Sequence, residues 1–132
     1  MKEVQRVSKT VELRKVIVSL LKQVTPNVFF DKVEEENPEF PYSVYSMNNV
    51  DLSSYPRDDI SVTVDIWDRN YDSIRVETLT DKLEKVLNRN NHPTDKILPT
   101  FYLVGRNSLE DEDSLIQRRQ LKFIVKNYEV RE

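Results

Sequence analysis

The stretch VTVDIWDRNYDSIRVETLTDKLEKVLNR, residues 62–89, changes its hydrophobic period half-way along. Up to Ile66 every second residue is apolar, which is typical of a β-strand, and from Ile74 onward the apolar residues follow helical spacing. When the strand is extended back to residue 60, its side chains fall into an aliphatic set (Ile60, Val62, Val64, Ile66) and a mostly polar set (Ser61, Thr63, Asp65, Trp67). This alternation predicts a sheet that helices cover on one face only.

The second half of the stretch predicts a helix capped by Ser73. Its buried stripe is expected to contain Ile74, Leu79, Leu83, Val86 and Leu87. A strand that leads through a short turn into a helix is also a common phosphate site, but such sites need glycines so that backbone N–H groups can approach the anion. The turn at residues 68–73 has no glycine, and Asp68 and Asp72 would repel a phosphate. We therefore interpret this turn as scaffold.

An amphipathic helix is predicted near the start of the chain, with Ser8 or Thr10 as its cap and Pro26 just beyond its end. Its apolar face consists of Leu13, Val16, Ile17, Leu20, Leu21 and Val24. Two β-prone runs, at 27–33 and 42–47, follow it and are expected to form a meander with the central strand. Polar, proline-containing breakers at 34–41 and 48–58 are expected to separate these three strands.

Two further strands are predicted at 100–106 and 119–130, joined by an acidic loop at 107–117. A loop of this length inside a compact domain is commonly functional or disordered. The predicted order is αβββαββ, a single α+β domain over residues 1–132. Its mixed or antiparallel sheet has about five strands, with both helices packed on one face.

The composition and charge of the chain exclude several classes of function. The chain has 20 Lys and Arg against 23 Asp and Glu, a net charge of −3 with one histidine, and no cysteine, which excludes disulfides and thiolate chemistry. With a pI near 5.3 it offers no basic field for gripping nucleic acid. No signal peptide or membrane-spanning run is recognisable, so we expect a soluble protein made and kept in a cytoplasm, without a membrane partner.

No catalytic or metal constellation emerges from the titratable residues. His92 lies in a polar loop without a second histidine, which favours a surface role. The acidic runs Glu34, Glu35, Glu36 and Glu110, Asp111, Glu112, Asp113 lack the central glycine of a calcium loop, so we interpret them as solvated loops and expect no cofactor or metal.

Asp65 has the position of a nuclease carboxylate, because it lies on the central strand and faces away from the predicted helices. Lys122 and Lys126 on the last strand are the candidate partners, but no second acid is evident, so an ordinary cross-strand charge pair is favoured. The aromatic residues Trp67, Tyr71 and Tyr102 fit core lids or interfaces better than a pocket. A binding or assembly protein, not an enzyme, is therefore the leading class.

The chain resembles the tail terminator, or tail completion, proteins of long-tailed bacteriophages and prophages. The resemblance covers nearly the whole chain. It rests on the leading amphipathic helix, on NVFFDKVEEENPEFPYSVYS (27–46), on ISVTVDIWDRNYDSIRVETLTDKLEKVL (60–87) and on LIQRRQLKFIVKNYEV (115–130). The resemblance implies a virion protein that forms a ring, typically hexameric, on the last ring of the tail tube. Such a ring ends tail growth and offers a docking surface to the neck of the head, and DNA passes through it unbound.

A ring needs two different patches on each subunit. We expect one on the open sheet face around Asp65 and Lys122, and the other in the 107–117 loop, with the 34–42 loop facing the tube or neck. The expected subunit and partner contacts are Glu34, Glu35, Glu36, Phe40, Tyr42, Thr63, Asp65, Trp67, Arg106, Glu110, Asp111, Glu112, Asp113, Lys122 and Lys126. Two alternatives stay open, a divalent-metal nuclease that uses Asp65, and a small module that binds a host protein.

Overall fold

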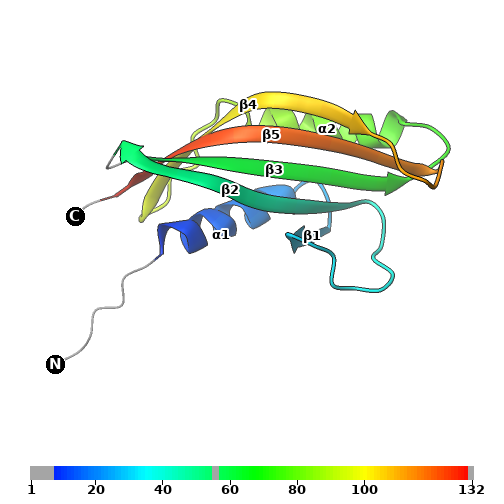
Figure 1. The fold of residues 1–132 in the computed structure, drawn as a ribbon, viewed down its shortest axis with the longest axis horizontal. Coiled ribbons are helices and arrows are strands. Elements are labelled where there is room, and N and C mark those ends of the chain that lie inside the picture. The colour runs from blue at the N-terminus through cyan, green and yellow to red at the C-terminus, as the bar shows by residue number, and fades with distance from the viewer. Residues whose placement is uncertain (1–7, 55–56, 131–132) are drawn as a thin grey trace.

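The computed structural model describes residues 8–54 and 57–130, with side chains throughout except at residues 49–54. It contains two helices and five strands in the predicted order, so the α+β class is confirmed (Figure 1). The elements are α1 (Lys9–Leu21), β1 (Asn27–Phe30), β2 (Tyr42–Ser54), β3 (Arg57–Arg69), α2 (Ile74–Leu87), β4 (Ile97–Leu109) and β5 (Ile116–Glu129). The start of the chain, where a signal peptide was not expected, lies outside the described residues up to residue 7.

The strands form one mixed sheet in the order β1-β2-β3-β5-β4. The central pairs are antiparallel, but β1 runs parallel to β2, with Asn27 opposite Tyr42. The predicted meander of the first three strands is therefore wrong. Residues 31–41 carry the chain back along β1, so that β2 begins beside the start of β1 instead of beside its end.

Two predicted connections are shorter than expected. Strand β2 continues to Ser54, into the predicted breaker at 48–58. Two register shifts interrupt its pairing with β3 in this part, between Asn48 and Val50 and between Asp51 and Ser54. Residues 55–56, between β2 and β3, lie outside the described residues. The acidic loop is shorter too, since β4 runs to Leu109 and β5 starts at Ile116, which leaves residues 110–115 as the turn of a long hairpin.

Both helices pack on the aliphatic face of the sheet, as predicted. The side chains of β3 alternate between buried and half-buried along its length, and Ile60, Val62, Val64 and Ile66 are buried with Leu121, Phe123 and Val125 of β5. Helix α1 contributes Leu13, Ile17, Leu20 and Leu21 to the same core, and α2 contributes Val76, Leu83 and Leu87. In the described parts of the chain, no helix is long and apolar enough to cross a membrane.

The two helix starts differ in how well the sequence predicted them. Ser8 caps α1, where its Oγ accepts a hydrogen bond from the Val11 N–H at 3.3 Å. The Ser73 side chain makes no capping bond in α2, and Asp72 Oδ1 accepts instead from the Ile74 N–H at 3.0 Å. Ile74 is also 71% exposed, contrary to the prediction, because it lies about 200° around the helix from Val76, which begins the buried stripe.

The outer edge of β4 is protected by the chain that follows α2. The Arg89 N–H donates to Phe101 O at 2.7 Å, the His92 N–H donates to Pro99 O at 3.0 Å, and Asn88 Oδ1 accepts from the Leu103 N–H at 2.9 Å. Edge strands left open invite pairing with other chains. Residues 88–92 therefore cover the stretch of this edge from Pro99 to Leu103.

Candidate functional site on the open face of the sheet

The face of the sheet opposite the helices carries polar, charged, aromatic and aliphatic side chains, and we call it the open face. Strand β3 contributes the half-buried Ser61, Thr63, Asp65 and Trp67, as the sequence predicted. Strand β5 adds Lys122, Ile124 and Lys126 in alternation with the buried core residues. This face is polar at its centre, and an apolar region lies on each side of that centre.

The first region is an aromatic cluster of Phe29, Phe40, Tyr42 and Trp67. The rings of Tyr42 and Trp67 stack with their centroids 6.1 Å apart and an interplanar angle of 12°. Phe40 and Phe29 pack against Tyr42 at 5.2 and 5.7 Å. Burial raises the pKa of the Tyr42 phenol, so that this ring stays neutral across the physiological range.

Arg118 covers the aromatic cluster and links it to Asp65. Its guanidinium carbon lies 4.4 Å from the centre of the Trp67 ring, and its Nη2 donates to Asp65 Oδ2 at 3.0 Å. Asp65 Oδ1 and Arg118 Nε are buried and have no partner among the described residues. Aromatic and arginine side chains in this arrangement are those enriched at the energetic centres of protein interfaces.

Sequence reasoning found four members of this group, Phe40, Tyr42, Asp65 and Trp67, but missed Arg118. It expected a cross-strand charge pair at Asp65, which is confirmed, but with Lys122 or Lys126, which is wrong. The register places Lys122 opposite Thr63 and Lys126 opposite Asp59, so Asp65 reaches diagonally to Arg118 instead. The register of β3 against β5 therefore determines which cation pairs with Asp65.

The second region is an apolar strip on β4 and β5, formed by Leu98, Tyr102, Val104 and Tyr128. These side chains are 45, 39, 62 and 39% exposed, and they account for four of the seven exposed large hydrophobic residues in the described chain. Leu98 lies opposite Tyr128 in the register, and Lys126 Nζ is 5.4 Å from the centre of the Tyr102 ring. Clustered exposed apolar side chains with a polar surround mark contact surfaces.

Arg106, an expected interface residue, lies on the side of α2. Its guanidinium donates to Glu77, Asp81 and Glu84 at distances of 2.8, 2.7 and 2.9 Å, while Arg119 also bonds Glu77. The register shift between Leu103 and Gly105 brings Arg106 opposite the buried Leu121. Hydrogen bonds from Arg119 and Arg106 hold the pKa of Glu77 below its ordinary value.

The two acidic runs are exposed and lie in connections between strands. Glu34, Glu35 and Glu36 lie in the β1–β2 connection, and Glu110 to Asp113 form the β4–β5 turn. Asp113 fixes this turn, because its carboxylate accepts from the Leu115 N–H at 2.9 Å and from Arg69 Nε at 3.3 Å. Over the described residues, no group of three or more His, Asp or Glu side chains is placed to share a metal ion.

The strand-to-helix turn is built as scaffold. Asp68 is fully buried and receives two hydrogen bonds from Arg75, Nε to Oδ2 at 2.8 Å and Nη2 to Oδ1 at 2.5 Å. Tyr71, in the same turn, is 91% exposed and lies outside the aromatic cluster. The carboxylate that would repel a phosphate is thus occupied in joining the strand to the helix.

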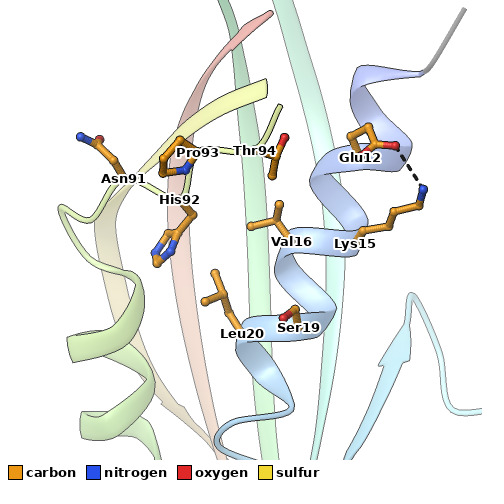
Figure 2. A pocket seen from close by; sticks show the side chains of 9 residues that line it. All are labelled: Glu12, Lys15, Val16, Ser19, Leu20, Asn91, His92, Pro93 and Thr94. Carbon is orange, nitrogen blue, oxygen red and sulfur yellow. Dashed lines mark hydrogen bonds and ion pairs between the residues drawn. The ribbon is translucent and has the colours of Figure 1, made fainter. Parts of the chain in front are cut away.

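His92 is half-buried, contrary to the expected surface position. Its Nε2 is 3.2 Å from Val86 O, its ring packs edge-on against Phe101 at 5.7 Å, and burial lowers the pKa of the imidazole. It borders a groove of about 510 Å³ between α1 and the 91–94 segment (Figure 2). Val16 and Leu20 of α1 face the segment across this groove, and the Glu12–Lys15 pair lies at its end.

The fold and the open face define a class: a small α+β domain with one sheet face closed by helices and the other bearing partly accessible aromatic, arginine and aliphatic side chains. The chain is similar in structure to a chain from the solved "Virion of native gene transfer agent (GTA) particle", with a TM-score of 0.59 and 12% identity, over 93% of this chain and 92% of that one. This likeness shows a shared fold. No protein family and no curated protein matches the sequence.

Proposed function

We propose that the protein is a structural component of a phage-like particle, located in the tail or neck of the virion. The observation that carries this proposal is the likeness to a chain of the gene transfer agent virion, because it extends over almost the full length of both chains. A shared fold does not by itself define function. The open face provides the second support, since it is equipped for contact with protein.

The particular role we propose is that of a tail terminator. In this role the protein forms a hexameric ring on the end of the tail tube, stops tube growth and provides the docking surface for the head or neck. The open face supports it by offering aromatic and apolar contacts to the tube or neck protein. The net charge of −3 suits a ring through which DNA slides, because phosphates are not attracted to it.

Deletion of the gene from the strain that encodes it, followed by electron microscopy, tests this role. The expected defect is overlong tubes or tails without heads, restored to normal by the intact gene. Particles of normal length and attachment would contradict a terminator role.

The two alternative functions have their own readouts. A nuclease would cleave DNA with Mg²⁺ or Mn²⁺, and Asp65→Asn would abolish the cleavage. A module that binds a host protein would capture one bacterial protein and leave tail assembly unchanged.

A further inference from the structure

Outside the open face, a groove runs along the outer side of α1. It has a volume of about 610 Å³, within the range of ligand-binding grooves, and it is lined by α1 and Tyr45. Val11, Val18 and Tyr45 form its apolar part, and Val11 is 46% exposed. Arg14, Lys15 and Lys22 are its cationic members.

The cations of this groove differ in how they are held. Arg14 is fixed, because its guanidinium carbon lies 3.7 Å from the centre of the Phe30 ring and its Nε is 3.5 Å from the Tyr45 hydroxyl. Lys15 pairs with Glu12 at 3.1 Å, and its side chain is 69% exposed. Lys22 is exposed just after the last turn of α1. The groove therefore combines an apolar floor with a net positive rim, which suits an acidic segment with apolar neighbours.

The β4–β5 turn has this chemistry. Glu110, Asp111 and Glu112 are exposed, and half-buried leucines, Leu109 and Leu115, flank the acids. The turn is held in shape by the Arg69–Asp113 pair and by the Asn70 N–H, which donates to Leu115 O at 2.8 Å. A segment that is already ordered loses little conformational entropy when it docks.

The turn and the groove belong to different parts of the molecule. Figure 1 shows the β4–β5 turn at one end of the long axis, whereas α1 lies beneath the middle and the opposite half of the sheet. No residue of the turn lines the groove of its own chain. Two different and complementary patches on one chain are what a head-to-tail contact between copies requires.

We propose that the acidic β4–β5 turn of one copy docks into the basic α1 groove of the next copy. This inference rests on the proposed function, because it supplies the contact between subunits of the ring, and it leaves the open face free for the tube or neck protein. Opposite charges at the contact fix which surfaces meet and speed their encounter, and apolar contact supplies the remaining affinity.

Charge reversal tests the contact. The variant Glu110→Lys/Asp111→Lys/Glu112→Lys keeps Asp113, which holds the turn, and it is expected to weaken self-association roughly 10-fold or more. The variant Lys15→Glu/Lys22→Glu reverses the groove with a similar loss. Combining the two sets restores opposite charges and is expected to recover assembly. The matched control, Asp95→Lys/Glu129→Lys, changes charge by as many units as the groove variant, at exposed acids outside both patches, and should leave assembly unchanged.

Cysteine cross-linking tests the same contact directly, because the chain contains no cysteine of its own. Oxidation of the Asp111→Cys/Lys22→Cys variant is expected to give a ladder of covalent oligomers that ends in a closed ring. The Glu35→Cys/Lys22→Cys pair is the control and should give none. Assembly is measured by native mass spectrometry, with tail-tube protein added where the isolated chain stays monomeric.

The outcomes separate this contact from the proposed function. A wild-type chain that assembles on the tube, together with reversed variants that assemble equally well, overturns the contact alone. A wild-type chain that never assembles, with tube protein present, overturns the ring and this contact with it. The contact is supported if the charge-reversed variants lose assembly, the combined variant recovers it, and Asp111→Cys/Lys22→Cys gives a ladder of covalent oligomers.

Discussion

The two faces of the sheet are made from the same strands but carry opposite kinds of side chain. On the covered face, aliphatic residues of β3 and β5 interlock with α1 and α2 and are almost completely buried. On the open face, the aromatic cluster, Arg118 and the apolar strip remain partly accessible. The covered face therefore stabilises the domain, whereas the open face keeps aromatic and apolar side chains accessible, and we propose that it is the face that contacts other proteins.

The largest expected effect lies on the covered face. Leu83→Ala removes a fully buried side chain of α2 and should lower the free energy of unfolding by about 3 kcal/mol, because it leaves a cavity among β3 and β5 residues. Urea unfolding measures it. The matched open-face change, Val104→Ala, should cost less than about 0.5 kcal/mol. Equal losses would abolish the distinction between the faces.

The next effect concerns the polar end of the covered face. Arg75→Ala removes the two hydrogen bonds that Arg75 donates to the fully buried Asp68 carboxylate, and leaves it the Arg69 N–H at 2.8 Å. The change should cost about 2 kcal/mol, because a buried charge loses its cationic partner. Lys82→Ala, an exposed change on the same helix, is the control. The same urea titration compares the two, and a loss no greater than that of the control would show that water replaces Arg75 at no cost.

On the open face, we expect a smaller change in the free energy of unfolding and a larger effect on binding to tails. Tyr102→Thr keeps strand propensity but removes a ring of the apolar strip, so co-sedimentation with tails should weaken about 10-fold while the free energy of unfolding changes by less than about 1 kcal/mol. Tyr71→Thr removes a ring that is 91% exposed in the turn and is the control. If both variants bind tails like the wild type, the strip is not a contact surface.

The smallest effect is electrostatic. Arg119 and Arg106 lower the pKa of Glu77 in the folded chain, so its contribution to stability is complete above the ordinary value of 4.5 and disappears as the pH falls through the lowered pKa. Glu77→Gln should therefore flatten the fall of the melting temperature as the pH drops below the ordinary Glu pKa of 4.5. The stabilisation lost is worth less than about 1 kcal/mol, since Glu77 is partly exposed. An unchanged slope would contradict this role for Glu77.

The local pattern of β3 predicted much of the site, but not its partners. Alternation along one strand fixes which side chains share a face, so Thr63, Asp65 and Trp67 were correctly placed together. The partner of Asp65 depends on the β3–β5 register, which is why Lys122 and Lys126 were chosen in place of Arg118. The place of Arg106 depends on register in the same way, because a register shift in β4 brings it opposite the buried Leu121.

By itself, the sequence determined the two helices, the five strands, their order and the one-sided covering of the sheet. These features follow from the spacing of apolar residues along short segments, every 2 residues in a strand and every 3.6 in a helix. Only the tertiary structure decided that β1 runs parallel to β2, that β5 lies between β3 and β4, and that Arg118 covers Trp67. These are relations between residues far apart in the chain, and they are set by long-range packing and register, which no local pattern encodes.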